Sequence, residues 1–302
     1  MEALLSLQFN LFVMIGVGFL IRKLHVIGSE GQKTLTDLVL YVVLPCNIAV
    51  SFLTDTAGGL AADCIAVLLI SIGIQILSVI YGKFCFPRQS KDRRRNLAYA
   101  MICSNAGFLG IAITESVFGP MGLMLTSIYL IPQRIMMWSE GLAIYSGVSD
   151  AKATAKKVLT HPCVIACEIG LLLMLTGLRP PTLLLTPVQT LARCNTPLSM
   201  MVIGMILGEI DLRNLIDKSI VEFSIHRLIL MPLVVYAACK LLSVSALVTG
   251  VSVLLAAMPA GATTTMLSAK YNRDPQYATK LVIFTTLCSI PAILIWSIIL
   301  TM

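Results

Sequence analysis

The sequence has few charged residues. Only 12% of its 302 residues are Asp, Glu, Lys or Arg, whereas 57% are hydrophobic. A soluble domain carries about 25% charged residues, so the composition indicates an integral membrane protein. A helix needs about 20 mostly apolar residues to span a bilayer, and several uncharged runs reach that length. These runs do not alternate polar and apolar residues, as the strands of a membrane barrel do.

The sequence also lacks the motifs of several functional classes. No HExxH, GxSG-type or nucleotide-binding P-loop motif is present, which argues against a membrane-embedded enzyme and an ATP-driven pump. The nine cysteines form no CxxC pair. Cys163 and Cys167 would share a helix face, but no histidine is expected at the same depth. We therefore expect no catalytic residue, no metal and no cofactor.

The apolar runs predict an all-α polytopic membrane protein with ten spans. We expect the spans at residues 3–22, 37–54, 63–82, 96–118, 121–147, 158–177, 187–208, 223–240, 246–269 and 277–301. In the eighth span only Leu228–Cys239 is uncharged, so Glu222 and Arg227 should lie near its end. Gly119-Pro120 predicts a very short turn between the fourth and fifth spans.

Lysine and arginine are distributed unevenly over the predicted loops. With the N-terminus outside, most of the 22 Lys and Arg residues fall in inner loops, the side on which they normally accumulate. Both termini are therefore predicted to face outward, most simply from a bacterial inner (cell) membrane. The net charge of +7 follows from this topology, so we expect no nucleic acid among the partners.

Two corresponding apolar runs are interrupted at their centres. Asn105-Ala106-Gly107 interrupts the fourth span, and Pro259-Ala260-Gly261 interrupts the ninth, about half the chain later. Each half, 1–150 and 151–302, holds five spans; because five is odd, the second half should be inverted relative to the first. Paired interruptions in inverted repeats are typical of a transporter binding site at the bilayer midplane.

The interruptions also favour a class of ligand. Pro259 removes an amide donor, and Gly107 and Gly261 permit unusual backbone conformations. Two half-helices that begin there would present N–H groups with partial positive charge, which can hold an anion. The alternative is that Pro259 only kinks a helix.

Charged residues within the spans have two interpretations each. Arg134 lies near the centre of the fifth span. It would either bind a substrate carboxylate through its planar guanidinium or form an ion pair with Glu115, Glu140 or Glu168. Glu140 and Glu168 would either carry a coupled proton or have structural roles.

Uncharged polar residues within the spans also have two interpretations each. Asn47 and Asn195, in the corresponding spans two and seven, would either line the substrate cavity or form hydrogen bonds between helices. Thr263, Thr264 and Thr265 follow the second interruption and would either satisfy freed carbonyls or contact substrate.

Two segments resemble motifs of the auxin efflux carrier family, which includes bacterial malonate and malate carriers and plant PIN proteins. They are Ser104-Asn105-Ala106-Gly107-Phe108-Leu109-Gly110 and Ala257-Met258-Pro259-Ala260-Gly261-Ala262. Leu44-Pro45 and Asn195-Thr196-Pro197-Leu198 are also similar, and the resemblance extends over essentially the whole chain. Plant members have proline after the first asparagine, where this chain has Ala106.

The resemblance implies a fold similar to that of sodium/proton antiporters and bile-acid transporters. Spans one, two, six and seven would form a scaffold, often dimeric, and spans three to five and eight to ten a moving transport core. Substrate would bind where spans four and nine cross, beside Asn105, Ala106, Gly107, Pro259, Ala260 and Gly261.

We therefore expect a secondary active or facilitated transporter of a small organic anion, such as a mono- or dicarboxylate or an auxin-like acid, that works by an elevator mechanism. The alternative is a membrane-embedded metabolite sensor built on a transporter fold. The expected partners are the anion, membrane lipid, a coupled proton or sodium ion, and a second copy of the chain in a homodimer.

Overall fold

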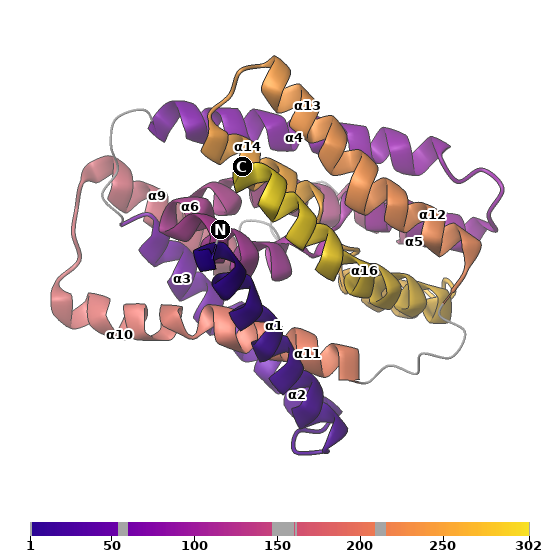
Figure 1. Cartoon of the computed structure of the whole chain (residues 1–302), viewed down its shortest axis with the longest axis horizontal. Coiled ribbons are helices and arrows are strands. Elements are labelled where there is room, and N and C mark those ends of the chain that lie inside the picture. Colours follow the sequence, from indigo (N-terminus) through magenta and orange to yellow (C-terminus); the bar gives the residue numbers. More distant parts are fainter. Residues whose placement is uncertain (1, 54–59, 147–159, 161, 209–215, 302) are drawn as a thin grey trace. The chain divides into compact units, whose positions relative to one another are not determined.

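The computed structural model describes residues 2–53, 60–146, 160, 162–208 and 216–301 (Figure 1). All regular structure in these residues is helical. The chain forms two compact units. The first unit comprises Met1–Leu60, Ile111–Ser127 and Leu159–Asp211, and the second comprises Ala61–Gly110, Ile128–Val158 and Leu212–Met302.

The first unit is built from helices of both halves of the sequence. They are α1 (Glu2–Lys23), α2 (Ser29–Leu38), the π-helical turn η1 (Val39–Val43), α3 (Leu44–Ser51), the first part of α6 (Leu109–Trp138), α9 (Pro162–Thr176), α10 (Thr182–Arg193) and α11 (Asn195–Gly208). Helices α2, η1 and α3 form one continuous helical stretch, Ser29–Ser51.

Helices α1 and α11 pack closely along each other in this unit (Figure 1). Glycines make this possible: a Cβ atom on Gly18 would clash with the carbonyl of Met201, and one on Gly204 with that of Ile15. Helices in lipid gain contact energy mainly by close packing, which small residues permit.

The second unit contains the remaining helices. They are α4 (Leu60–Phe84), α5 (Lys91–Ile102), the 3₁₀ turn η2 (Asn105–Gly107), the second part of α6, α7 (Glu140–Ser146), α12 (Lys218–Ile225), the π-helical turn η3 (His226–Leu230), α13 (Met231–Leu241), α14 (Ala246–Ala256), α15 (Thr263–Lys270) and α16 (Pro275–Thr301).

Six helical stretches of the described residues are long and apolar enough to cross a membrane. They are Ser29–Ser51, Ala62–Phe84, Leu109–Met137, Thr182–Gly208, Lys218–Leu241 and Pro275–Leu300. Pro162–Thr176 and Ala246–Ala256 are shorter apolar helices. The described part of the chain is thus that of a helical membrane protein, while the ten-span inverted arrangement stays a prediction.

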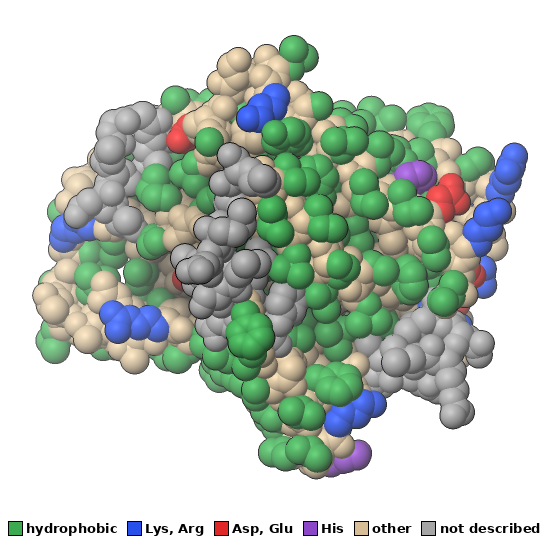
Figure 2. All heavy atoms as spheres, in the orientation of Figure 1, with side chains coloured by type: hydrophobic (Ala, Val, Ile, Leu, Met, Phe, Trp, Pro, Cys, Tyr) green, Lys and Arg blue, Asp and Glu red, His purple; other side chains and the backbone are tan. Residues whose placement is uncertain are grey.

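The surface of several helices suits lipid. On α4, five large side chains at helical spacing are exposed: Ile65, Leu69, Ile72, Ile76 and Ile80. Figure 2 shows hydrophobic side chains covering the visible face over α13 and α16. An apolar surface of this extent would promote aggregation in water, whereas in a membrane lipid chains cover it.

The predicted turn at Gly119-Pro120 appears as a kink inside α6. Gly119 has φ +65° and ψ −157°, a conformation that only glycine adopts easily. Thus α6 consists of two helices that meet at Gly119. The first of them, which begins at Leu109, carries the residues that follow the first interruption.

Candidate binding site at two helix interruptions

The backbone leaves helical geometry at both places where the sequence predicts an interruption. Helix α5 ends at Ile102 and α6 begins at Leu109, with the short η2 turn between them. Helix α14 ends at Ala256 and α15 begins at Thr263. Pro259, which has no amide hydrogen to donate, lies in the second gap.

The two interrupted segments are antiparallel and hydrogen-bonded to each other. The amide of Asn105 donates to the carbonyl of Pro259 at 2.8 Å, and the amide of Gly261 donates to that of Cys103 at 3.0 Å. A Cβ atom on Gly261 would lie 2.9 Å from the Cys103 oxygen, so only glycine fits there without a shift. These bonds satisfy backbone groups that could not be left unpaired in an apolar interior.

Ser104 and Ala260 form a single β-bridge at the centre of this pair. The Gln133 amide (Nε2) donates to the Ser104 carbonyl at 2.9 Å, and the Ser104 hydroxyl donates to Gln133 Oε1 at 3.4 Å. The Ala260 amide donates to the Thr285 hydroxyl at 3.2 Å. Gln133 is buried, and the sequence analysis missed it. A buried amide beside Arg134 in an apolar run was the available signal.

Arg227 supplies a positive charge to the ends of both interrupted helices. Its Nε donates to the Met258 carbonyl at 3.0 Å, and its Nη1 donates to the Met101 carbonyl at 3.0 Å. Met101 lies in the last turn of α5, and Met258 follows the end of α14. The last carbonyls of a helix carry partial negative charge, so one guanidinium compensates two helix ends.

Arg227 was predicted near the end of the eighth span and was not predicted as a site residue. It lies in the continuous helical stretch Lys218–Leu241 and is 3% exposed. Hydrogen bonds to two carbonyls offset much of the cost of burying its charge.

Because Arg227 compensates the partial negative charge of these carbonyls, the partial charge that remains at the interruptions is that of the helix N-termini. Helices α6 and α15 both begin at the interruptions, and a helix N-terminus carries partial positive charge. Thr263, the first residue of α15, has its hydroxyl 3.2 Å from the Cys103 sulfur. The arrangement therefore attracts negative charge.

Arg134 is a second buried guanidinium in this unit. It is 7% exposed, and its Nη1 atom is buried without a hydrogen-bond partner among the described residues. No ion pair joins it to Glu140, which is exposed and lies in the same unit. A buried donor without a partner is unfavourable by about 1–3 kcal/mol, and by more when it is charged.

Asn47 and Asn195 meet in the first unit. Each donates through Nδ2 to Glu115 Oε2, at 2.9 Å from Asn47 and 3.3 Å from Asn195. The Thr196 hydroxyl donates to the same oxygen at 3.1 Å. The two asparagines thus form hydrogen bonds between helices, one of the two roles the sequence left open. Glu168, on α9 of this unit, is exposed.

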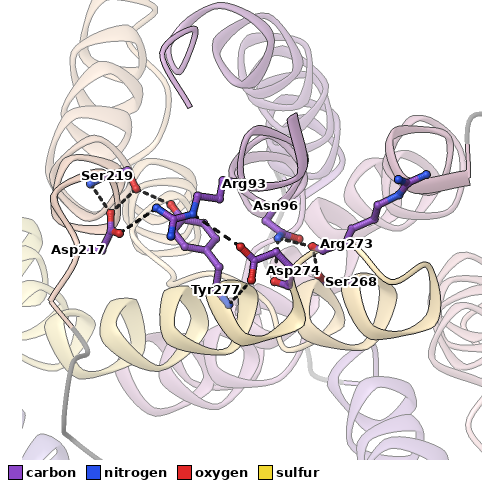
Figure 3. A network of polar contacts seen from close by, with 8 residues as sticks. All are labelled: Arg93, Asn96, Asp217, Ser219, Ser268, Arg273, Asp274 and Tyr277. Atoms are coloured by element: carbon purple, nitrogen blue, oxygen red, sulfur yellow. Dashed lines mark hydrogen bonds and ion pairs between the residues drawn. The ribbon is translucent and has the colours of Figure 1, made fainter. Parts of the chain in front are cut away.

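A polar network joins the N-terminal ends of three helices of the second unit (Figure 3). Arg93 of α5 lies 3.2 Å from Asp217, which precedes α12, and 3.7 Å from Asp274, which precedes α16. Its guanidinium also stacks over the Tyr277 ring at 4.7 Å. Asp217 accepts from the Ser219 hydroxyl and amide, and these bonds, with Arg93, hold the pKa of its carboxyl below the ordinary value.

Asn96 fixes the link between α15 and α16 in the same network. Its Nδ2 donates to the Arg273 carbonyl at 2.8 Å, and its Oδ1 accepts from the Tyr145 hydroxyl at 2.7 Å. Asn272 and Asp274 in this link have positive φ angles of 51° and 54°. A residue other than glycine keeps a positive φ angle only where surrounding contacts hold it there. The network therefore stabilises the link between α15 and α16, which follows the second interruption in the chain (Figure 3).

Comparison with known sequences identifies the family. A family model described as membrane transport protein matches residues 4–155 and 148–297. The chain belongs to the auxin efflux carrier family of membrane transport proteins.

Two curated relatives of the family match the chain over nearly its full length. An uncharacterized transporter of Methanothermobacter thermautotrophicus is 25% identical over 295 residues, 96% of each chain. An uncharacterized transporter of Methanocaldococcus jannaschii is 22% identical over 297 residues, 94% of each chain. Both are described as transporters and neither as an enzyme. Family membership and the apolar helices together show an integral membrane transport protein.

Proposed function

We propose that this protein is a secondary active or facilitated transporter of a small organic anion, a mono- or dicarboxylate or an auxin-like acid. Membership of a transporter family supports transport. The groups at the interruptions support an anion. The two helix N-termini there carry partial positive charge, and the buried guanidinium of Arg227 binds carbonyls on the C-terminal side. Arg134 is a second buried guanidinium of the same unit.

The observation that carries the proposal is the buried Nη1 atom of Arg134, which has no partner among the described residues. A substrate carboxylate would supply two acceptors to its planar guanidinium. Arg227 is less suited to this role because its Nε and Nη1 already bind carbonyls. The proposed contact residues around the substrate are Asn105, Ala106, Gly107, Pro259, Ala260, Gly261 and Thr263.

The proposed mechanism is elevator-type alternating access in a ten-span protein with two inverted five-helix repeats. Spans three to five and eight to ten would carry the substrate past a scaffold of spans one, two, six and seven, which would also hold a homodimer together. All the hydrogen bonds between the interrupted segments lie within the second unit. A rigid-body movement would therefore preserve them.

Ligand binding by variants of Arg134 tests the site. Lysine keeps the charge but loses the planar pair of donors, so Arg134→Lys should weaken binding of malonate or malate by about 1–3 kcal/mol, roughly 5- to 150-fold. Arg134→Gln should weaken it further. Affinity and thermal stability of the purified variants would be measured in the same detergent, with an indole carboxylate as the auxin-like probe.

Arg193→Gln is the matched control, since Arg193 is an exposed arginine at the end of α10. It should bind the same anions with unchanged affinity. If the Arg134 variants lose stability while the remaining folded protein binds with unchanged affinity, Arg134 is a structural residue and the proposed carboxylate contact is wrong.

A further inference from the structure

Glu115 is a carboxylate surrounded by neutral hydrogen-bond donors in an apolar helix bundle. It is half-buried on the first part of α6, within the helical stretch Leu109–Met137 that is long and apolar enough to span a membrane. Three donors converge on its Oε2 atom, from Asn47 at 2.9 Å, Thr196 at 3.1 Å and Asn195 at 3.3 Å. Its Oε1 atom makes no hydrogen bond with a described residue.

Within the first unit, no ion pair joins Glu115 to a described residue. Helices α3 and α11, which bring its three partners, contain no charged side chain. The titratable groups nearest to those partners in sequence are the Cys46 and Cys194 thiols, both half-buried. Arg193 ends α10 and is exposed, and no ion pair joins it to Glu115. Glu168 on α9, which packs against α3, is exposed.

These contacts suit a proton better than a metal cation. A metal ion such as sodium needs several oxygen ligands directed at it, whereas all three partners of Glu115 direct N–H or O–H groups at the carboxylate. Those donors all bind Oε2, and Oε1 has no hydrogen-bond partner among the described residues. A carboxyl group inside a membrane segment with no structural ion pair is typical of proton relays.

The position of Glu115 along α6 relates the proton to the anion. It lies on α6, six residues after Leu109, the residue with which this half-helix begins after the first interruption. A negative charge on this half-helix opposes an anion bound at its N-terminus, and protonation removes that charge. Anion binding and proton binding should therefore favour each other, and this coupling is reciprocal.

We propose that Glu115 binds the proton that travels with the transported anion, an inference that rests on the proposed transport function. One proton binds Oε1 to give the neutral acid and leaves again as a proton. Glu140 and Glu168, for which the sequence left open either a coupled proton or a structural role, are both exposed. In this proposal the side chains of Asn47, Asn195 and Thr196 hold the carboxyl group of Glu115 in place through Oε2.

Direct detection of proton binding needs no substrate. In an infrared difference titration of the full-length protein in lipid nanodiscs, acidification should produce the carbonyl bands of protonated carboxyl groups, one of which comes from Glu115. Glu115→Gln keeps an oxygen acceptor for the three donors and should lack that one band, whereas Glu168→Gln should retain it. A Glu115→Gln spectrum that lacks none of the carbonyl bands of the unmodified protein overturns the assignment.

Transport in proteoliposomes then tests the coupling, with radiolabelled malonate as the probe. An inward proton gradient should drive accumulation by the unmodified protein. Glu115→Gln should lose at least about tenfold of this accumulation while keeping malonate exchange at equal pH on both sides. Glu115→Asp, which retains a carboxyl group, should recover part of it. An equal response of Glu115→Gln to the gradient, or uptake driven by sodium instead of protons, contradicts the proposal.

The two measurements separate this inference from the function on which it rests. If no carboxylate is transported by the unmodified protein, the anion transport proposal fails, and the infrared titration still decides whether Glu115 binds a proton. If malonate exchange is normal but independent of Glu115 and of pH, transport stands and the proton site is wrong.

Discussion

At the scale of single residues, the buried Arg227 is the clearest structural determinant of the site. Its guanidinium binds carbonyls of Met101 and Met258, which are 126 and 31 residues away in sequence. The C-terminal ends of α5 and α14 can end inside an apolar unit because this side chain pairs with them. We expect the fold of the interruptions to depend on both bonds.

Substitution of Arg227 should therefore reduce stability more than substitution of an exposed arginine. Arg227→Leu leaves two buried carbonyls unpaired and should lower the unfolding free energy by roughly 3–5 kcal/mol. Arg227→Lys keeps the charge but not the fork that reaches both carbonyls, so its loss should be intermediate. Thermal unfolding in detergent measures this, with Arg193→Leu as the control; equal effects at positions 193 and 227 would contradict the assigned role.

Sequence reasoning at this scale identified residue types better than partners. Asn47 and Asn195 were singled out because they occupy corresponding spans, yet nothing in the sequence indicated that Glu115 lies between them. Arg227 was missed as a site residue because its partners are backbone carbonyls, which leave no mark on the sequence. Gln133 was missed although an amide in an apolar run was a signal. Arg134 was recognised because a charge inside an apolar run is rare and needs an explanation.

At the scale of elements, glycine and proline positions were the most informative part of the sequence. The gaps after α5 and α14 and the kink at Gly119 all fall where these residues occur, since they change backbone geometry locally. The π-helical turns η1 and η3 were not predicted. Both precede a proline, at Pro45 and Pro232, in the first turn of the next helix. A proline ring clashes with the carbonyl four residues earlier, which here lies in the π-helical turn.

The packing of α1 against α11 predicts different effects on stability for substitutions of Gly16 and Gly18. Gly18 is buried and a Cβ atom there would clash with the Met201 carbonyl, whereas a Cβ atom on Gly16 would meet nothing within 4 Å. Gly18→Ala should separate the helices and lower the unfolding free energy by roughly 1–3 kcal/mol. Gly16→Ala should be neutral or stabilising by up to about 1 kcal/mol, because alanine is the better helix former.

Thermal unfolding of the two alanine variants in the same detergent checks this. Both glycines lie in α1 and each is replaced by alanine, so the gain in helix propensity is the same in the two variants and cancels when they are compared. A loss at position 16 equal to that at position 18 would show that close packing of α1 on α11 does not stabilise the protein.

At the scale of the whole molecule, composition was sufficient to predict a helical membrane protein, and the matched interruptions to predict a transporter. The number of spans was harder to establish. The predicted ninth span is divided into α14 and α15, of 11 and 8 residues, neither long enough to cross alone. The predicted orientation rests on the distribution of lysine and arginine.

The central claim is that the paired interruptions form the site through which a small organic anion is transported. The most direct test is exchange of radiolabelled malonate and malate in proteoliposomes, comparing the unmodified protein with the double variant Pro259→Ala, Gly261→Leu. The larger side chain at 261 cannot approach the Cys103 carbonyl, and alanine at 259 restores a helix-compatible amide. We predict saturable exchange by the unmodified protein and none by the double variant, with both inserted and monodisperse; normal exchange by the double variant, or no carboxylate exchange by the unmodified protein, would contradict the claim.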